Sequence, residues 1–179
     1  TAENNYYQDA SKAVAKTSSQ ELALKEFNEF VDLLRANHIQ VIVVPDLVEN
    51  QTPDSIFPNN WVSFHENGHV FLYPMYAKSR RKERRPEILD QVQNFGFSNS
   101  NITDLSFTEN DGLYLEGTGS MIFDRANQIA YAARSIRTDE NLFTRYCETI
   151  GYQPVVFSSF QTVDQKRLTI YHPNVMMCV

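Results

Sequence analysis

The clearest chemical signal in the sequence is a carboxylate followed at once by small residues. Glu116 precedes Gly117, Thr118 and Gly119. Glycines leave the backbone accessible and let a ligand approach closely. The stretch SMIF, the polar turn RANQ and the stretch IAYAA follow, and their alternation predicts a β-hairpin. We therefore expect Glu116 at the mouth of a strand, where a ligand can reach it.

A cysteine nucleophile is not expected within the chain. Cys147 and Cys178 are the only cysteines, too few for a disulfide framework and without metal-ligand spacing. Cys178 lies six residues after His172. On a strand this spacing gives ~20 Å at ~3.3 Å per residue, which excludes a direct pair. We expect Cys178 to be a small core residue, and Cys147 has no base near it in sequence.

Two other groups of polar side chains are interpreted as surface features. His65 and His69 flank an ENG turn and have no third ligand, so we expect them in solvent and predict no metal site. The basic run RRKERR, residues 80–85, lies beside a helix start in a chain of net charge −6. A solvated face is expected there, with no nucleic-acid partner. Phosphate-loop, dinucleotide and CxxC motifs are missing, so no cofactor is expected.

Length and composition are those of a globular protein. The chain has 179 residues, of which 42% are hydrophobic and 21% charged, so we predict a single domain, 1–179. Neither an apolar run of about 20 residues nor a signal peptide occurs. We therefore expect a cytoplasmic protein with no membrane partner. Homo-oligomer formation is left open.

Helical and strand patterns alternate along the chain. Ser18 and Glu21 predict a capping box at a helix start, and Asn37 is the predicted stop. The strand VIVVPD, residues 41–46, should follow. The apolar positions of this helix are Phe27, Phe30, Val31 and Leu34.

The later elements follow the same logic. A hairpin is predicted around Asn67-Gly68. Two helices are predicted, one starting at Pro86 and ended by Gly96, the other capped by Thr138 and ended by Gly151. Strands are predicted at Ile102–Leu105, at QPVVF and in LTIYHPNVMMCV, which should open a further hairpin.

The order of elements repeats. Phe64 and Phe123 are 59 residues apart, as are Val70 and Ile129, so the two hairpins should superimpose without a gap. A predicted helix stop and the next strand mouth are 23 residues apart in three places, from Asn37 to Asn60, from Gly96 to Gly119 and from Gly151 to Asn174. These three equal spacings indicate a duplicated strand–strand–helix–strand unit whose copies pack around a shared centre.

The repeat predicts four units, approximately 18–46, 55–106, 113–159 and 168–179, of which the first and last are partial. Both ends of the chain cut through a unit. We therefore expect the chain to be the central part of a longer protein.

Four strings carry a family resemblance: DSIFPNNWVSFH, LYPM with RRKERRPEIL, LEGTGSMIFDR and YHPNVMM. Together they resemble the guanidine-modifying (pentein) superfamily, and most of all its amidinotransferase-like branch of citrulline-utilisation hydrolases. The resemblance implies an α/β-propeller of ββαβ units about a pseudo-fivefold axis. Roughly two whole units and two partial ones would lie in this chain.

The resemblance also implies catalytic residues. Glu116 of LEGTG matches the family's catalytic acid, and His172 of YHPN matches its catalytic histidine. Arg137, within the SxRT motif Ser135–Thr138, matches an arginine that contacts substrate. The nucleophilic cysteine of the family lies near the C-terminus of the full enzyme and has no match here. We therefore expect the chain alone to be inactive.

Two further positions depart from the deiminase pattern. Asn60, with Phe57, matches an FxxD motif, and Asn174 matches the position two residues after the histidine. Deiminases carry substrate-binding carboxylates at both positions. An amide offers an acceptor and a donor without charge, which suits a neutral ureido group. The resemblance implies hydrolysis of a C–N bond in a small-molecule substrate through a covalent cysteine intermediate. From the two amides we expect this substrate to be a ureido amino acid such as citrulline more readily than an arginine-like one.

Two alternative functions follow from the same resemblance. Amidino transfer to an amine acceptor would pass through the same covalent intermediate, so the sequence does not separate it from hydrolysis. Non-catalytic proteins of this fold bind the large ribosomal subunit. Such a binder would not need Glu116, His172 and the SxRT motif, and the charge of −6 also disfavours contact with RNA.

Overall fold

The computed structural model describes residues 16–179, and the chain divides into two compact units, Thr1–Asp46 and Leu47–Val179. The first unit contains the long helix α1 (Lys16–Ala36). Phe27, Val31 and Leu34 are its least exposed side chains, whereas Phe30 is exposed. The apolar stripe is therefore narrower than predicted, and the placement of Phe30 in it is wrong.

Three further expectations for this unit are wrong. Ser18 is already a helical residue of α1, so it does not cap the helix. His38, with φ 62°, and not Asn37, takes the left-handed conformation after the helix. Residues 41–46 form no strand. An apolar run becomes a strand only where a neighbouring strand pairs with its backbone groups, and none does so among residues 16–179.

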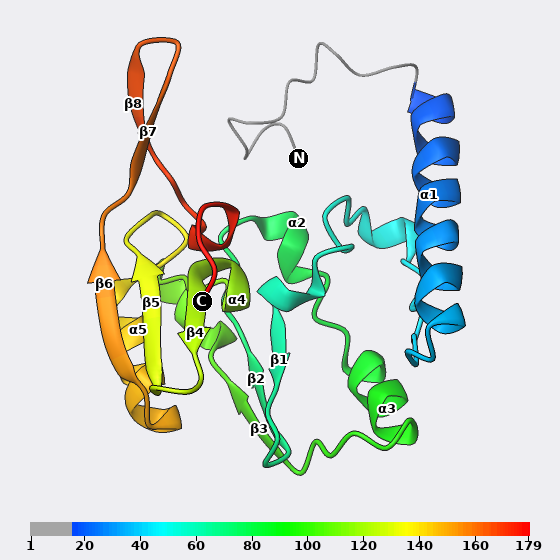
Figure 1. Cartoon of the computed structure of the whole chain (residues 1–179), viewed down its shortest axis with the longest axis horizontal. Helices are drawn as coiled ribbons and strands as arrows, with labels where there is room; N and C mark the ends of the chain where they lie inside the picture. Colours follow the sequence, from blue (N-terminus) through cyan, green and yellow to red (C-terminus); the bar gives the residue numbers. More distant parts are fainter. Residues whose placement is uncertain (1–15) are drawn as a thin grey trace. The chain divides into compact units, whose positions relative to one another are not determined.

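In the unit Leu47–Val179 one strand–strand–helix–strand topology occurs twice (Figure 1). In the first copy β1 (Val62–Phe64) pairs antiparallel with β2 (His69–Leu72), which pairs parallel with β3 (Asn101–Asp104). Helix α3 (Pro86–Asn94) lies in the crossover between β2 and β3. It starts at Pro86 as predicted.

The second copy repeats these connections. Strand β4 (Met121–Asp124) pairs antiparallel with β5 (Ile129–Ala133), and β5 pairs parallel with β6 (Gln153–Phe157). Helix α5 (Glu140–Ile150) lies in the crossover and packs on β5 and β6 (Figure 1). The predicted mixed α/β class is confirmed.

The two hairpins differ by one residue. Phe64 pairs with Val70, whereas Phe123 pairs with Ala130 and not with Ile129. The predicted superposition without a gap is therefore wrong. A one-residue slip within a strand would turn its side chains to the opposite face, so the extra residue is taken up by the turn.

Thr138 does not cap α5. The cap is Asp139, whose Oδ1 accepts a hydrogen bond from the Leu142 N–H at 2.8 Å. Thr138 is buried, and its hydroxyl donates to Ser120 Oγ at 2.8 Å. Gly151, with φ 74°, ends the helix as predicted.

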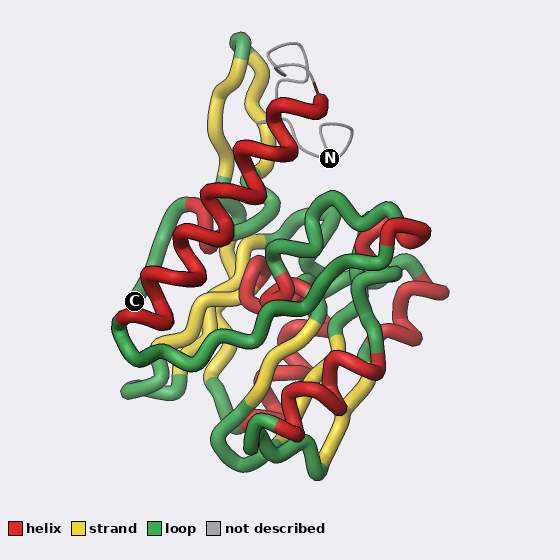
Figure 2. Tube along the Cα trace, turned by 90° about the vertical axis from the view of Figure 1, so that its right-hand side faces the viewer, coloured by secondary structure: helices red, strands yellow, loops and turns green. Residues whose placement is uncertain are grey.

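The last predicted hairpin lies elsewhere. Strand β7 (Phe160–Val163) pairs with β8 (Lys166–Thr169), and this hairpin precedes His172 (Figure 1). Figure 2 also shows this hairpin projecting from the rest of the unit. Asp164 and Gln165, in the turn of this hairpin, both have positive φ, as a tight hairpin turn requires. Neither is a glycine, so the usual sequence signal of such a turn is missing here.

Strand β2 joins the two hydrophobic clusters of this unit. Val70 belongs to the smaller cluster and Phe71 to the larger, because successive strand residues face opposite sides. The smaller cluster also contains Trp61, Val62, Met75 and Leu89. The larger one also contains Tyr73, Leu115, Met121, Ala130, Ala132, Leu142, Phe143, Tyr146 and Cys147.

Short helical segments connect these elements. They are η3 (Val48–Asn50), η4 (Pro58–Asn60), α2 (Lys78–Arg81), η5 (Ser106–Asp111), α4 (Gly117–Ser120) and η6 (Pro173–Val175). None of the helices in the described part of the chain is long and apolar enough to cross a membrane.

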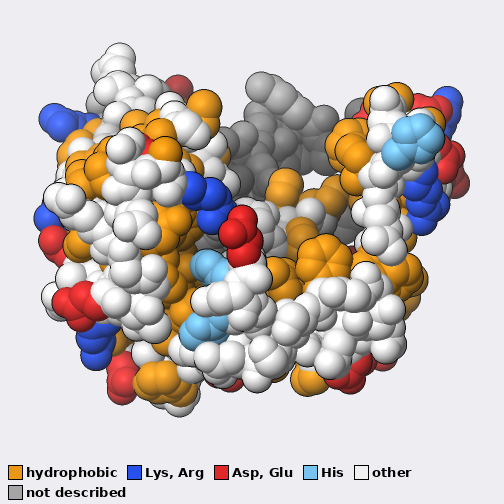
Figure 3. Space-filling model, turned by 60° about the horizontal axis from the view of Figure 1, so that its bottom comes forward, with side chains coloured by type: hydrophobic (Ala, Val, Ile, Leu, Met, Phe, Trp, Pro, Cys, Tyr) orange, Lys and Arg blue, Asp and Glu red, His pale blue; other side chains and the backbone are white. Residues whose placement is uncertain are grey.

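His65 and His69 are not simply solvated. Both are half-buried and lie against Phe71, with ring centroids 5.2 Å and 4.3 Å away. His65 Nε2 is hydrogen-bonded to Ser63 Oγ at 3.0 Å and His69 Nε2 to Thr103 Oγ1 at 2.7 Å. In the face drawn in Figure 3, imidazole side chains reach the surface beside hydrophobic ones. No group of side chains suited to a metal ion occurs within residues 16–179.

Candidate active site

Glu116 lies at the entrance to β4, as predicted. It is the N-cap of the single turn α4, and the Ser120 hydroxyl accepts a hydrogen bond from its N–H at 3.0 Å. Ser120 Oγ also donates to the Arg137 carbonyl at 3.1 Å. Since Arg137 follows β5, the β4–β5 hairpin brings the two segments to the same end of the sheet.

The Glu116 carboxylate is fully buried, with 0% exposure, and three donors surround it. His172 Nε2 lies 2.7 Å from Oε2, and Arg137 Nη1 lies 3.3 Å from the same oxygen. The Tyr76 N–H donates to Oε1 at 3.0 Å. These donors come from three separate segments of the chain, so the carboxylate connects the three segments through its polar contacts.

These contacts decide the charge of Glu116. Burial raises its pKa, since a low dielectric disfavours the anion. The hydrogen bond from His172, the charges of His172 and Arg137 and the Tyr76 N–H act in the opposite direction. Their combined effect lowers the pKa of the Glu116 carboxyl below its ordinary value. The group is therefore a carboxylate at neutral pH.

His172 is positioned by the turn that follows the β7–β8 hairpin. It is the N-cap of η6, and the residue is 8% exposed. Because a carboxylate only accepts hydrogen bonds, Nε2 must be a protonated ring nitrogen, and its N–H donates to Glu116. The second ring nitrogen, Nδ1, points toward Gly119.

Gly119 allows this imidazole and the Asn60 amide to approach the α4 turn closely. A Cβ on Gly119 would lie 3.1 Å from His172 Nδ1 and 3.0 Å from Cε1, and it would overlap Asn60 Nδ2. Gly117 has φ +44°, and a Cβ there would overlap the backbone oxygen of Asn59. The small residues after Glu116 thus permit close contact among neighbouring turns of the protein itself. The predicted access of a ligand to Glu116 is wrong, because this residue is fully buried in the structure.

The equal spacings in the sequence correspond to three helical turns. Asn60 lies in η4, Gly119 in α4 and Asn174 in η6, and α4 contacts both of the other turns. The structure therefore brings together equivalent positions of successive repeats. These turns supply the residues around the Glu116–His172 pair.

Asn60 is buried and bonded at both ends of its amide. Its Oδ1 accepts from Arg80 Nη1 at 2.6 Å, and its Nδ2 donates to the Glu116 carbonyl at 3.4 Å. Only the amine end of the Asn60 side chain faces Gly119. The oxygen expected to serve as a second ligand contact is engaged by the protein.

Arg137 is also buried, with 5% exposure. Its guanidinium lies over the Tyr171 ring at 4.5 Å and over the Tyr76 ring at 5.7 Å, in addition to its contact with Glu116. Stacking on aromatic faces favours an arginine cation in such a position. Arg137 is therefore held beside the carboxylate.

Asn174 and Phe57 differ from the other predicted site residues because both are exposed. Asn174 lies in η6 two residues after His172. Phe57 is the N-cap of η4, and its carbonyl accepts from Arg80 at 3.0 Å. No side-chain hydrogen bond links either residue to Glu116 or His172 in the described structure.

The cysteines differ in environment. Cys147 is buried in the core, and burial raises the pKa of its thiol to about 12, so it is a poor nucleophile, as predicted. Cys178 is exposed, so its predicted core placement is wrong. The segment after η6 is not the expected strand, and no sheet covers this residue.

Sequence reasoning did not find the arginines that support the site. The run RRKERR is not a solvated face, since Arg80 and Glu83 are buried and Arg84 binds Glu109 at 2.6 Å. Arg80 and Glu83 carry opposite charges three residues apart, and this spacing was the available signal for their ion pair. Tyr76 and Tyr171 were also missed, because nothing in the sequence connects them with Arg137.

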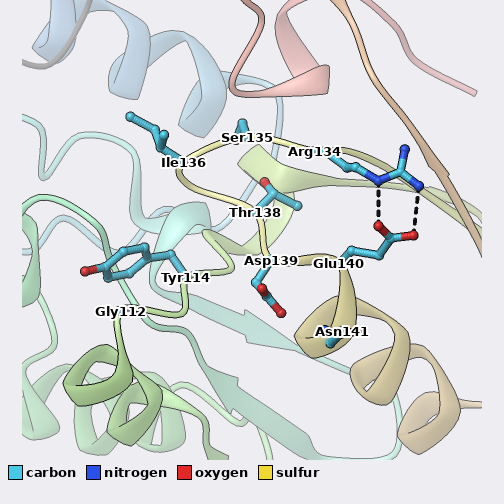
Figure 4. A pocket seen from close by; sticks show the side chains of 9 residues that line it. All are labelled: Gly112, Tyr114, Arg134, Ser135, Ile136, Thr138, Asp139, Glu140 and Asn141. Carbon is cyan, nitrogen blue, oxygen red and sulfur yellow. Dashed lines mark hydrogen bonds and ion pairs between the residues drawn. The ribbon is translucent and has the colours of Figure 1, made fainter.

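A depression lies next to this site, at the start of α5 (Figure 4). It measures about 380 Å³. Tyr114 and Ile136 lie on one side of it, and the ion pair between Arg134 and Glu140 lies on the other. It is lined by Gly112, Tyr114, Arg134, Ser135, Ile136, Thr138, Asp139, Glu140 and Asn141.

The pair formed by Glu116 and His172 is suited to proton transfer. A carboxylate fixes one ring nitrogen, and the other ring nitrogen lies toward Gly119. An imidazole in this arrangement can pass a proton to or from a bound molecule.

Residues 1–179 match a family model described as N,N dimethylarginine dimethylhydrolase, eukaryotic.

The chain belongs to this dimethylarginine dimethylhydrolase family. The predicted membership of the guanidine-modifying superfamily is confirmed. No significant match was found among curated proteins.

Solved structures with a similar fold include members of the same superfamily. The product-bound N-terminal domain of ArgZ, an arginine dihydrolase from cyanobacteria, has a TM-score of 0.61 and 21% identity over 86% of this chain and 50% of that one. The dimethylarginine dimethylaminohydrolase of Pseudomonas aeruginosa with citrulline has a TM-score of 0.57 and 20% identity over 76% of this chain and 50% of that one. The chain spans about half the length of these proteins, and at this identity the likeness concerns the fold.

Proposed function

We propose that the chain forms part of a hydrolase that cleaves a C–N bond in a small ureido or guanidino amino acid. The observation that carries the proposal is the 2.7 Å contact between His172 Nε2 and the buried Glu116 carboxylate. Family membership supports this reaction class. The similar structures include an arginine dihydrolase and an enzyme with bound citrulline.

In this proposal His172 transfers protons and Glu116 orients it. A cysteine thiolate attacks the ureido or guanidino carbon, and the leaving amine takes a proton from His172. Water, deprotonated by the same imidazole, then breaks the bond to sulfur. The carboxylate holds the ring and stabilises its protonated form.

The nucleophile is proposed to lie outside this chain. Cys147 has a raised thiol pKa and is buried, and neither Cys147 nor Cys178 is hydrogen-bonded to His172 in the described structure. The chain by itself should therefore be inactive. The two ββαβ copies would be consecutive blades of a five-unit propeller, in which the missing units complete the site.

Substrate contacts are proposed for Asn60, Asn174, Phe57 and Arg137. Asn174 and Phe57 are exposed on turns that flank α4, and Asn60 directs its amine toward Gly119. Amides at positions 60 and 174 provide no negative charge to a cationic guanidinium. A neutral ureido substrate such as citrulline is therefore favoured over arginine.

The test is steady-state kinetics of the intact protein with citrulline and with arginine. Replacing Glu116→Gln keeps the shape but removes the charge, and kcat should fall by about 10²–10⁴-fold. Glu87→Gln, at an exposed position in α3, is the control and should leave kcat unchanged. Equal activity of the Glu116 variant and the wild type would refute the proposed role, and faster turnover of arginine than citrulline would refute the substrate preference.

A further inference from the structure

Arg80 is a buried cation that the chemistry described above does not use. It is 4% exposed, and its guanidinium donates in three directions. Nε and Nη2 each lie 3.0 Å from a carboxylate oxygen of Glu83. Nη2 also donates to the carbonyls of Asp54 and Phe57, at 3.1 Å and 3.0 Å.

The third direction leads to the candidate site. Arg80 Nη1 lies 2.6 Å from Asn60 Oδ1. A guanidinium has five N–H donors and no acceptor. The Asn60 atom that faces Arg80 must therefore be the oxygen, and the amine end must point the opposite way.

The opposite end of the amide borders the catalytic pair. Asn60 Nδ2 donates to the Glu116 carbonyl, and the same nitrogen borders Gly119 on the side occupied by His172. The carbonyl oxygens bonded by Arg80, at positions 54 and 57, lie in the loop that leads into η4. One side chain thus fixes both the loop that carries Asn60 and the direction of its amide.

We propose that Arg80 is a positioning residue, which locks the Asn60 amide so that its N–H group, and not its oxygen, faces the Glu116–His172 site. The catalytic relevance of this lock rests on the function proposed above. Glu83 completes the arrangement by holding the guanidinium plane through two parallel hydrogen bonds. A lysine would supply the charge but could not hold Glu83 in this way and bond Asn60 as well.

The test removes the lock without leaving a buried charge. In the intact protein, the double variant Arg80→Gln/Glu83→Gln replaces both charged partners, and a glutamine at position 80 can accept or donate toward Asn60. Arg85→Gln/Glu87→Gln, which removes a neighbouring ion pair whose Glu87 side chain is half exposed, is the matched control. Arg80→Lys is the second test variant and is decisive if the double variant does not fold.

Two measurements are made on each variant. The side-chain amide protons of Asn60, observed by NMR after selective ¹⁵N-asparagine labelling, report its orientation. Solvent exchange of these protons should be at least ten-fold faster in the double variant and unchanged in the control. Steady-state kinetics with citrulline should show a loss in kcat of about ten-fold in the double variant, again without change in the control.

The outcomes separate the lock from the proposed function. Unchanged Asn60 exchange in a folded Arg80 variant would overturn the lock. Faster exchange with unchanged kcat would overturn its role in positioning. If the wild type turns over neither citrulline nor arginine, the proposed function fails, and the Asn60 exchange still decides whether Arg80 holds the amide.

Discussion

Glu116 remains ionised because donors from three segments outweigh the cost of burying its charge. At the scale of single residues, the sequence predicted Glu116 and His172, and the structure places them in contact. A motif could indicate them because each lies at the mouth of a repeated unit. Arg80 and Tyr171 could not be predicted in the same way, since their partners lie 20 to 34 residues away in sequence at positions with no common spacing.

Gly119→Ala tests whether the close contact of Gly119 with His172 and Asn60 is needed. The added methyl group would overlap Asn60 Nδ2 and press on the imidazole, so we expect a loss of ~1–3 kcal/mol in the free energy of unfolding together with a large fall in kcat. Chemical denaturation and kinetics of the intact protein measure both.

The control for this substitution is Gly151→Ala. Gly151 has φ +74° with nothing within 4 Å of an added Cβ, so the cost there is ~1–2 kcal/mol of backbone strain alone. Its kcat should be unchanged. A Gly119 variant with wild-type kcat would show that this close contact has no catalytic role.

His65 should make stability depend on pH. Burial is the main cause of its lowered pKa, and the charges of Arg125 and His69 act in the same direction. The unfolded chain therefore binds a proton at His65 more readily than the folded protein does. Stability conferred by the neutral ring is present above the unfolded pKa of about 6.5 and is lost as pH falls through the lower folded value.

His65→Gln removes this titration while keeping a hydrogen-bond partner for Ser63. Between pH 7 and pH 5 the urea midpoint of the wild type should fall more than that of the variant. Since the other histidines are present in both proteins, their effects cancel in the comparison. Equal decreases would contradict the lowered pKa.

At the scale of elements, alternation and turn residues predicted the strands of the two three-stranded sheets and the helices α3 and α5. The errors concern helix ends, the superposition of the two hairpins, the place of the β7–β8 hairpin and unpaired segments. Thr138 and Asp139 are both good capping residues, and only the burial of Thr138 against Ser120 decides between them. The run at 41–46 has strand character but no partner among residues 16–179.

The cap of α5 provides a test at this scale. Asp139→Ala removes the acceptor for the Leu142 N–H and should lower the free energy of unfolding by ~1 kcal/mol. Asp139→Asn keeps an oxygen acceptor and should cost only a few tenths of that. Thermal denaturation compares the two variants, and equal losses would mean that the effect is due to charge and not to capping.

At the scale of the whole unit Leu47–Val179, the two ββαβ copies are joined through a common core. Phe71 and Tyr73 from the first copy pack with residues of the second, and Tyr73 Oη donates to Tyr146 Oη at 2.9 Å. The repeat in the sequence indicated a shared centre but not which residues form it, because packing partners leave no local signal.

Cooperative unfolding of this unit can be measured with Trp61, the only tryptophan in the chain. Phe143→Ala in α5 creates a cavity in the larger cluster and should cost ~3–5 kcal/mol. Although Trp61 lies in the other cluster, its fluorescence midpoint should decrease as much as the circular-dichroism midpoint, because β2 contributes to both clusters. An unchanged fluorescence midpoint would show that the copies unfold independently.

The course of the β4–β5 hairpin has a practical consequence. Glu116 precedes β4 and Arg137 follows β5, so both lie at one end of the hairpin, while the exposed turn Arg125–Gln128 lies at the other. The turn is separated from the end of the hairpin that carries Glu116 and Arg137 by the whole length of two strands. A peptide tag or fluorescent reporter spliced between Ala126 and Asn127 would therefore label the molecule without entering the chemistry.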